Sequence, residues 1–353
     1  MQTRTLGELT LPRIVLGTMA YGSNRSRAQQ TDTIHAAIDA GMSAVDTAPL
    51  YHFGQTEELL GHALRGRDVQ VLGKVGIRWD ADARGEVMLR TQIAGRPIVA
   101  RKDARPQAVR RDVEESLTRL GRERLDLCQL HHRDVHTPIA ETMGELLRLR
   151  DEGKVGAIGA SNLCPAGLRE AKEALGDVPL STHQLEYSLL APHGRRDVDA
   201  AVSLGVGTLL YSPLHRGALV GGASSRARFD RRDPRRQRTP FLHANARRID
   251  AALEHGVVPI ASRTGHSVAQ VVLAWLLHQP GVDALVVGAS APAHAEANAG
   301  AARLVLEADD LRRITWTFAG LALDPDAAPR RREILEAQAR RVAGALLRRL
   351  GLR

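Results

Sequence analysis

The sequence predicts a (β/α)8 barrel, in which eight parallel strands close into a ring and each strand is followed by a helix. Short aliphatic runs of strand length recur eight times along the 353 residues, with helix-period segments between them. These runs are apolar almost throughout, which is typical of parallel strands buried on both faces. Five of the seven intervals between run ends are 23–30 residues, the length of one strand, turn and helix.

The eight expected strands each end where an aliphatic run is closed by a small, polar or aromatic residue. They end at Thr18 (IVLGT), Asp46 (SAVDT), Lys74 (VQVLGK), His131 (LDLCQLH), Ser161 (VGAIGAS), Gln184 (LSTHQ), Tyr211 (VGTLLY) and Gly288 (ALVVG). Eight such units in succession predict closure into a barrel rather than an open, doubly wound sheet.

The segments around the strands carry signals for helix ends and for one hairpin. Asp39-Ala40-Gly41 is expected to close the first helix and Leu120-Gly121 the third, because glycine accepts the left-handed conformation that ends many helices. Thr137-Pro138 is expected to open the fourth helix with a cap and a first-turn proline. Before the first strand, the segment from Gln2 to Pro12 predicts a hairpin that closes the bottom of the barrel.

Two intervals between strand ends are longer, at 57 and 77 residues, and place extra chain after the third and seventh strands. These loops run from Val75 to about Arg105 and from Ser212 to about Gly265, at the barrel face that carries the chemistry of such folds. The second loop contains an arginine-rich stretch and a helix-period segment from Phe241 to His255. A lid over the site and a plain insert are equally good interpretations of both loops.

The chain is expected to form one barrel domain over residues 1–328, followed by a basic amphipathic helix over residues 329–353. The apolar positions of this helix are Ile334, Leu335, Ala337, Val342, Leu346, Leu347 and Leu350. Packing on the barrel or exposure to solvent is favoured for this helix over binding to a membrane or a partner.

The composition is that of a globular protein, with 43% hydrophobic and 25% charged residues. The net charge is +9 at pH 7, and only four residues are lysine, so arginine supplies nearly all of the positive charge. Residues 226–238 and 330–353 carry +5 and +6, which leaves −2 for the rest of the chain. We therefore expect no nucleic-acid or membrane partner, because the positive charge lies in one loop and the tail and is not interleaved with aromatic residues.

Cysteine content and hydropathy indicate the compartment. Only Cys128 and Cys164 are present, too few for a disulfide framework and not spaced for a metal site, which fits a reducing environment. No uninterrupted apolar stretch approaches the ~18 residues of a membrane span, and the first residues do not have the pattern of a signal peptide. We therefore expect a cytoplasmic protein.

Four ionisable residues stand at or near the ends of consecutive strands. Asp46, Lys74 and His131 close the second, third and fourth strands, and Tyr51 follows Asp46 by five residues. Because strand ends converge on the barrel axis, the four side chains are expected to share one pocket. A carboxylate beside Lys74 would keep the ammonium charged, and that charge would lower the pKa of Tyr51 below ~10. A phenol tuned in this way can deliver a proton near neutral pH.

Each of these residues also has an ordinary structural explanation. Asp46 fits a helix cap, Tyr51 half-buried packing, Lys74 a strand-end side chain that reaches solvent, and His131 a core histidine with satisfied hydrogen bonds. Taken singly, each structural explanation is favoured. The occurrence of all four after consecutive strands favours a catalytic site instead.

Six strings in these regions resemble the aldo-keto reductase family. They are DTAPLY with FGQTEELLG (Asp46 to Gly61), VLGKVG around Lys74, LDLCQLHHRD around His131, GKVGAIGASN (Gly153 to Asn162), QLEYS (Gln184 to Ser188) and YSPLHRGALVGG (Tyr211 to Gly222). The resemblance covers the chain to about Ala302, and bacterial members that act on sugars, polyols or small aldehydes are the most similar. It implies a (β/α)8 barrel that binds a nicotinamide cofactor.

By this resemblance, Asp46, Tyr51, Lys74 and His131 are the catalytic tetrad of a carbonyl reductase or alcohol dehydrogenase. Tyr51 is implied as general acid in reduction and as general base in oxidation, and Lys74 paired with Asp46 lowers its pKa. His131 is implied to orient the carbonyl oxygen of an aldehyde or ketone. The hydride is implied to come from C4 of the reduced nicotinamide.

The resemblance also implies the cofactor contacts. Ser161, Asn162 and Gln184 would hold the carboxamide, Tyr211 would stack on the ring, and the loop from Ser212 would wrap the pyrophosphate. The expected set is Gly17, Thr18, Met19, Asp46, Ser161, Asn162, Gln184, Tyr211, Ser212, Pro213, Leu214, Arg216, Gly217, Gly288, Ser290, His294 and Asn298.

At the adenosine end the chain departs from the pattern of the family. Many relatives that hold a 2′-phosphate have Lys-Ser after the eighth strand and an arginine six positions past that lysine, whereas Gly288, Ala289 and His294 stand here. An arginine of the second long loop can replace the missing cations, and Ser290 and Asn298 fit the remaining pattern. We therefore favour NADP(H), with NAD(H) as the alternative.

The substrate pocket is expected to be formed by Tyr21, Phe53, Trp79, His132 and the two long loops, and a small polar or sugar-like carbonyl compound is the expected substrate. Two other functions remain open. One is a non-catalytic, redox-sensing subunit that keeps the cofactor, as in the potassium-channel β-subunit branch of the family. The other is a metal-dependent hydrolase built on the histidines after the fourth strand, although the charge of Lys74 disfavours a cation there.

Overall fold

The structure, a computed structural model, describes residues 1–22, 26–93, 95–221, 235 and 238–324. The chain divides into two compact units. The first consists of Met1–Pro213 and Val272–Leu306, and the second lies within Leu214–Val271 and from Glu307 on. The expected helix over residues 329–353 lies outside the described residues, and the division into a barrel of residues 1–328 and a tail stays a prediction.

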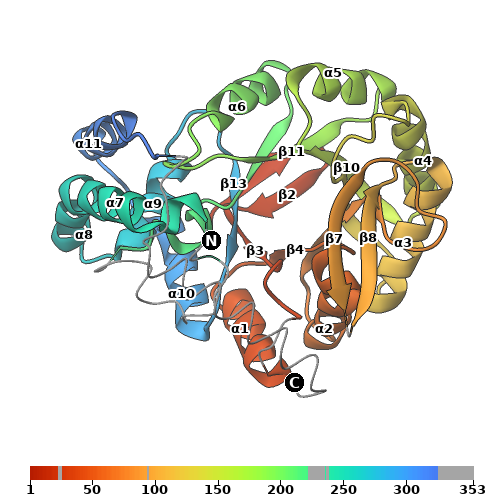
Figure 1. The fold of residues 1–353 in the computed structure, drawn as a ribbon, viewed down its shortest axis with the longest axis horizontal. Helices are drawn as coiled ribbons and strands as arrows, with labels where there is room; N and C mark the ends of the chain where they lie inside the picture. The colour runs from red at the N-terminus through yellow and green to blue at the C-terminus, as the bar shows by residue number, and fades with distance from the viewer. Residues whose placement is uncertain (23–25, 94, 222–234, 236–237, 325–353) are drawn as a thin grey trace. The chain divides into compact units, whose positions relative to one another are not determined.

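Eight parallel strands of the first unit close into a barrel, so this prediction is confirmed (Figure 1). Around the ring, hydrogen-bonded neighbours follow the order β3-β4-β5-β9-β10-β11-β12-β13, which is the order of the chain, and β13 pairs with β3 to close it. The strands are β3 (Ile14–Gly17), β4 (Ala44–Asp46), β5 (Gln70–Val75), β9 (Leu125–Leu130), β10 (Val155–Ser161), β11 (Leu180–Glu186), β12 (Gly207–Tyr211) and β13 (Ala284–Gly288).

The expected N-terminal hairpin is also present, as β1 (Thr3–Leu6) paired antiparallel with β2 (Leu9–Pro12). Three of its leucines join one apolar cluster with inward-facing residues of the barrel strands. That cluster consists of Leu6, Leu9, Leu11, Val15, Ala44, Leu72, Leu127, Ala157, Leu209, Ala284 and Val286, with Tyr211 packed against it. The hairpin lies at the N-terminal ends of β11 and β12, where Leu6 leaves room at Gly207 for no side chain. The opposite, C-terminal strand ends therefore carry the polar side chains.

Helices of the first unit surround the strands (Figure 1). They are α1 (Arg27–Asp39), α2 (Gln55–Ala63), α3 (Pro106–Leu120), α4 (Ile139–Asp151), α5 (Pro165–Ala174), α6 (Gly194–Ser203) and α10 (Pro292–Gly300). Neighbouring helices pack on one another from α10 through α1 to α6, with the short η6 (Ala301–Arg303) after α10. The ends expected at Asp39 and at Leu120-Gly121 are confirmed, and Gly121 has a φ of 61°.

The expected cap of the fourth helix is wrong. The Thr137 hydroxyl donates to the Asp134 carboxylate at 2.8 Å, and α4 begins at Ile139 with Pro138 itself at the cap position. The helix begins one residue later than expected, so Pro138 stands at the cap position and not in the first turn, and Thr137 lies before the cap.

The loop after the third barrel strand contains a small antiparallel sheet. Its strands are β6 (Ile77–Arg78), β7 (Val87–Ile93) and β8 (Arg96–Lys102), paired in the order β6-β8-β7. The β6 strand begins two residues after β5 ends, so this sheet continues directly from the strand that carries Lys74.

The second unit holds a small group of helices. They are η2 (His215–Gly217), η5 (Thr239–Phe241), α7 (His243–Gly256), α8 (Val258–Thr264) and α11 (Ala308–Ala319), and the chain returns to the first unit within α9 (Val268–Leu277). The helix expected over Phe241 to His255 corresponds to α7 and is confirmed. Within this unit α7 packs against α11, and Arg263 donates to Asp310 at 2.5 Å. Of the helices in the described ranges, none has both the length and the apolar composition to span a bilayer.

Candidate active site

A buried ion pair joins the ends of β4 and β5. The Lys74 ammonium donates to both carboxylate oxygens of Asp46, at 2.7 and 2.6 Å, and to the carbonyl oxygen of Thr47 at 3.2 Å. Only 1% of the lysine side chain and 2% of the aspartate side chain are exposed. Tyr51 is a fourth contact of the ammonium, with its hydroxyl 3.4 Å from the lysine nitrogen. Three of the four expected catalytic residues are therefore in direct contact.

Tyr51 is presented by a tight turn, η1 (Tyr51–Gly54), that follows β4. His52 and Phe53 have positive φ values of 47° and 54°, and Gly54 has a φ of 90°. Positive φ is uncommon for residues other than glycine and costs about 1–2 kcal/mol each. Backbone hydrogen bonds hold the turn closed, including one from the Gly54 amide to the Pro49 carbonyl at 2.8 Å.

His131 completes the group from the end of β9. Its ring meets the Tyr51 ring edge-on, with the centroids 6.2 Å apart, and stacks on His132 with the centroids 5.1 Å apart. Burial lowers the pKa of His131 well below its ordinary value, and the charges of Lys74 and His132 act in the same direction. Burial likewise lowers the pKa of His132 to about 4, together with Lys102 and Lys74. Both imidazoles are therefore neutral at physiological pH.

The ion pair keeps Lys74 charged. Burial by itself would lower the pKa of this lysine, but the Asp46 carboxylate and the Tyr51 hydroxyl together raise it above its ordinary value. This direction agrees with the expectation that a carboxylate beside Lys74 keeps the ammonium charged.

The pKa of Tyr51 is raised, not lowered, which corrects the expectation from the sequence. Burial raises it most, the Lys74 ammonium opposes that effect, and the Asp46 carboxylate adds to it. The carboxylate lies closer to the ammonium than the phenol does, so much of the positive field at Tyr51 is cancelled. Tyr51 therefore carries its proton at neutral pH.

Two expected carboxamide ligands at the end of β10, Ser161 and Asn162, bond to one another, and Asn162 also bonds to Tyr211, the expected stacking residue at the end of β12. Asn162 donates to the Ser161 hydroxyl at 2.9 Å and to the His131 carbonyl at 3.0 Å, and it accepts from the Tyr211 hydroxyl at 2.8 Å. Asn162 has a φ of 56°, a conformation that asparagine tolerates better than most residues. These bonds fix the row of polar groups next to the tetrad.

Gln184, at the end of β11, joins this row to the ion pair. Its amide nitrogen donates to Asp46 at 2.7 Å, a contact that the sequence did not indicate. A nicotinamide carboxamide has one oxygen that accepts hydrogen bonds and one NH2 group that donates them. The hydroxyl and amide groups of Ser161, Asn162 and Gln184 include both donors and acceptors for these atoms. The donor set of these three strand ends therefore fits such a group.

The end of β3 brings Gly17 and Thr18 beside the tetrad. The Thr18 hydroxyl donates to the Asp46 carbonyl at 2.7 Å, which ties this strand to the neighbouring one. A Cβ at Gly17 would lie 2.9 Å from the Val286 side chain, so only glycine fits. Met19 follows with 48% of its surface exposed, an unusual exposure for a side chain of this size and polarity.

The expected adenosine contacts form a corner between β13 and α10. The Ser290 hydroxyl lies 2.9 Å from Nδ1 of His294, and the Asn298 amide donates to the Gly288 carbonyl at 3.3 Å. The first turn of α10 carries no acidic residue.

The expected pyrophosphate loop is turned repeatedly into the left-handed conformation. In the first unit, Ser212 has a φ of 54° and is followed by Pro213. Leu214, Arg216 and Gly217 belong to the second unit, where the φ values of Arg216 and Gly217 are 58° and 97°.

The four expected substrate-pocket residues do not all gather at one place. Phe53 and Trp79 are half-buried and meet edge-to-face, with the ring centroids 5.3 Å apart. His132 lies on the far side of His131, within 3.4 Å of the Asn162 amide. Tyr21 is buried, and its hydroxyl donates to the Ala289 carbonyl at 3.0 Å, at the corner near the adenosine contacts.

Metal binding finds little support in these residues. Within the described part of the chain, no group of three or more His, Cys, Asp or Glu side chains is placed to hold a metal ion. Asp134, which follows the two histidines, instead accepts from the Ala104 amide at 3.1 Å and from the Thr137 hydroxyl at 2.8 Å.

The geometry agrees with comparisons to known proteins. The sequence model of the Aldo/keto reductase family matches residues 13–316. The chain belongs to the aldo/keto reductase family. It is therefore an NAD(P)-dependent oxidoreductase that acts on carbonyl or alcohol groups.

Similar proteins of this family are bacterial. Aldo-keto reductase YhdN of Bacillus subtilis (strain 168) is 31% identical over 336 residues, which cover 91% of this chain and 96% of the relative. The NADH-specific methylglyoxal reductase of Escherichia coli (strain K12) is 30% identical over 321 residues, 86% of this chain and 93% of the relative.

Solved structures of the family have the same fold. The glycerol dehydrogenase of Gluconobacter oxydans matches with a TM-score of 0.79 at 30% identity, over 92% of this chain and 97% of that one. An aldo-keto reductase of Bacillus halodurans in its holo form matches with a TM-score of 0.72 at 22% identity, over 94% of this chain and 99% of that one, which shows the fold alone.

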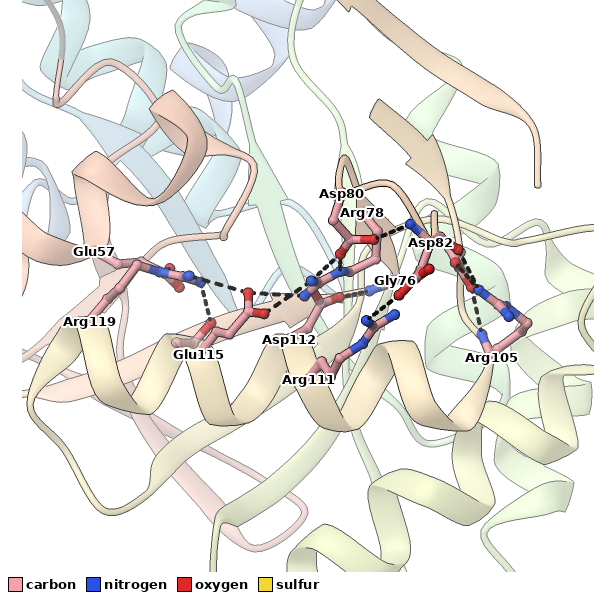
Figure 2. Close-up of polar contacts among 12 residues, drawn as sticks. Glu57, Gly76, Arg78, Asp80, Asp82, Arg105, Arg111, Asp112, Glu115 and Arg119 are labelled. Atoms are coloured by element: carbon pink, nitrogen blue, oxygen red, sulfur yellow. Dashed lines mark hydrogen bonds and ion pairs between the residues drawn. The ribbon is translucent and has the colours of Figure 1, made fainter. Parts of the chain in front are cut away.

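Sequence reasoning missed a stripe of charged residues on α3 of this family member. Asp112, Glu115 and Arg119 are spaced as i, i+3 and i+7 and therefore share one helix face, and they contact Arg78 and Glu57 (Figure 2). The signal was available, because Asp112 stands among the apolar positions of an amphipathic helix.

The ion pair predicts a specific pattern of stability changes. Asp46→Asn leaves the Lys74 ammonium buried without a counter-charge, so we expect a loss of about 3–5 kcal/mol in the free energy of unfolding. The double variant Asp46→Asn with Lys74→Met removes both charges and is expected to lose less than Asp46→Asn alone. Urea unfolding of the wild type, both single variants and the double variant measures this coupling; strict additivity of the two single losses would contradict it.

Proposed function

We propose that this protein reduces a small, polar aldehyde or ketone with hydride from NADPH, and that Asp46, Tyr51, Lys74 and His131 are its catalytic residues. The observation that carries the proposal is the Tyr51 hydroxyl within 3.4 Å of a lysine whose charge is held by a buried carboxylate. A phenol, an ammonium and a neutral imidazole in one pocket form a proton-delivery site.

Tyr51 delivers the proton in this mechanism. The carbonyl oxygen of the substrate accepts the Tyr51 proton, and the Lys74 ammonium stabilises the phenolate that remains. Asp46 keeps Lys74 protonated through the two short hydrogen bonds. His131 is neutral, so it can donate a hydrogen bond to the same oxygen and orient it without carrying charge.

The nicotinamide supplies the hydride from C4 to the carbonyl carbon when it is bound. Ser161, Asn162 and Gln184 hold its carboxamide in this proposal, and Tyr211 offers an aromatic face. This arrangement leaves the Tyr51 hydroxyl as the acid nearest to the reacting oxygen.

The proposed substrate class has two supports. His131 meets the Tyr51 ring and His132 stacks on His131, and both histidines are polar but neutral at physiological pH. Two similar proteins are described as a methylglyoxal reductase and a glycerol dehydrogenase, whose substrates are small and oxygen-rich. A small carbonyl compound with a second polar oxygen therefore suits this site.

Removal of the Tyr51 hydroxyl is the direct test of the mechanism. Tyr51→Phe removes the proton donor but leaves the ring, so we expect a loss of at least 1000-fold in kcat, with less than a threefold change in the Kd of NADPH. Single-turnover kinetics and cofactor fluorescence titration measure the two quantities. Retention of more than a tenth of the wild-type kcat would overturn the role of Tyr51.

The raised pKa of Tyr51 predicts opposite pH dependences for the two directions. The reductive reaction needs the protonated phenol, which is present at all pH values below the Tyr51 pKa, so its rate is expected to stay level from pH 6 to 9. The oxidative reaction needs the phenolate, so its rate is expected to rise across the same range. Initial rates under saturating cofactor measure both profiles, and parallel profiles would contradict the assignment.

NADPH is the proposed cofactor, with tighter binding than NADH as the expected result. The corner at Ser290 and His294 offers no lysine or arginine of its own. In this proposal an arginine of the second long loop supplies the positive charge for the 2′-phosphate instead. Part of that loop lies outside the described residues. Fluorescence titration with both cofactors is expected to give a Kd at least tenfold lower for NADPH. A lower Kd for NADH would reverse the proposal and would match the preference that the name of the Escherichia coli relative states.

A further inference from the structure

A network of six charged residues takes no part in the mechanism proposed above (Figure 2). Its members come from β6 and the segment that follows it, from α2 and from the charged stripe of α3. We call it the Arg78–Arg119 network, and it consists of Glu57, Arg78, Asp80, Asp112, Glu115 and Arg119.

Arg78 stands at the centre of one half of this network. All five of its N–H groups donate to carboxylates: Nε to Asp80 at 2.7 Å, two to Glu115 at 3.0 Å each, one to Asp112 at 2.9 Å, and one more to Asp80. Five donors are the full capacity of a guanidinium group. The side chain is 6% exposed, so Arg78 is held in one conformation.

Trp79 is the residue between the two anchored positions Arg78 and Asp80. Asp112 also accepts from the Gly76 amide at 2.8 Å, which fixes the backbone between Lys74 and Trp79. The backbone that carries the Trp79 indole is therefore held on both sides.

Arg119 anchors the other half of the network. It donates to Glu57, a fully buried residue of α2, at 2.7 Å. Its stem also packs on Gly54, where a Cβ would lie 2.9 Å from the Arg119 Cδ. Gly54 directly follows Phe53 in the turn that presents Tyr51. Arg119 therefore supports the segment that carries Phe53.

Glu115 connects the two halves. One of its oxygens accepts from Arg78 at 3.0 Å and from Arg119 at 3.5 Å, and the other accepts from Arg78 at 3.0 Å. Burial would raise the pKa of Glu115, but the two arginines hold it below its ordinary value, so the carboxylate is ionised at neutral pH. One carboxylate thus joins the support of Trp79 to the support of Phe53.

The two aromatic rings that the network supports contact one another. Phe53 and Trp79 are perpendicular, with an interplanar angle of 87° and centroids 5.3 Å apart, and both are half-buried. Such an edge-to-face pair contributes about 0.5–1.5 kcal/mol beyond its buried area, too little to hold two loops together alone. The charged network supplies the additional constraint.

We propose that Glu115 is a positioning residue, which holds Trp79 against Phe53 through Arg78 and Arg119 and thereby determines which carbonyl substrates bind beside Tyr51. This inference rests on the proposed function for its substrate. It concerns the shape of the pocket edge and not the proton transfer, because Glu115 touches neither Tyr51 nor Lys74 by any described hydrogen bond.

The test compares Glu115→Gln with Glu114→Gln. Glutamine keeps the size of the side chain but removes the charge that joins the two arginines. Glu114 is the matched control, because it is the preceding residue of α3 and its ion pairs are with Lys154 at 2.7 Å and Arg110 at 3.7 Å, outside the network. Arg119→Lys is a second variant that acts on the Phe53 side alone, in case Glu115→Gln does not fold.

Two readouts are used. In a background with Trp275→Phe and Trp316→Phe, Trp79 is the single tryptophan, and its emission and its quenching by acrylamide report the packing of the indole directly. The second readout is steady-state reduction of 4-nitrobenzaldehyde and glyceraldehyde with NADPH. We expect Glu115→Gln to double acrylamide quenching and to raise KM for 4-nitrobenzaldehyde at least fivefold, with kcat within twofold and the Kd of NADPH unchanged. Glu114→Gln is expected to match the wild type.

The outcomes separate the inference from the proposed function. Unchanged quenching and KM in Glu115→Gln and in Arg119→Lys would overturn the positioning role, as would a lower Tm with quenching and KM of the folded protein unchanged. Equal effects in Glu114→Gln would overturn it as well. If the wild type reduces neither aldehyde, the proposed function fails, and the quenching of Trp79 still decides whether Glu115 holds the indole.

Discussion

The buried ion pair between Lys74 and Asp46 is the interaction on which the rest of the site depends. Two charges removed from water cost several kcal/mol each, and their attraction offsets this only when the geometry is close and the remaining hydrogen bonds are satisfied. Here both carboxylate oxygens contact the ammonium, and Gln184 and the Thr47 carbonyl take up further hydrogen-bonding capacity. A charge held in this way is fixed in position before any substrate arrives, as electrostatic catalysis requires.

The closed barrel makes this pair possible. Asp46 and Lys74 stand at the ends of adjacent parallel strands, so their side chains reach the same layer at the open end of the barrel. The apolar cluster below them, closed by the N-terminal hairpin, keeps water away from the opposite side. The strained turn that follows β4 then places the Tyr51 hydroxyl 3.4 Å from the ammonium. Burial of the phenol and the nearby Asp46 carboxylate together explain why the tyrosine keeps its proton.

Much of the fold and of the candidate site was predictable from local sequence patterns. The eight strands, the hairpin and α7 were expected because buried parallel strands and amphipathic helices leave a clear apolar period. The sheet formed by β6, β7 and β8 was not expected. The residues of β7 are exposed or half-buried throughout, so apolar and polar residues do not alternate along it with the period of two that indicates a strand. The cap at Thr137 failed for a different reason: α4 begins one residue later than the Thr-Pro pair indicates, with Pro138 at the cap position.

The sequence by itself determined the order of the strands and the four ionisable residues that stand at their ends, because both follow from patterns within short segments. Only the tertiary structure decided the direction of the Tyr51 pKa, the contact of Gln184 with Asp46, and the joining of Arg78 to Arg119 through Glu115. Each of these depends on distances between segments that are far apart in the chain. Desolvation and charge pairing change steeply over a few ångströms, and residue types alone do not specify such distances.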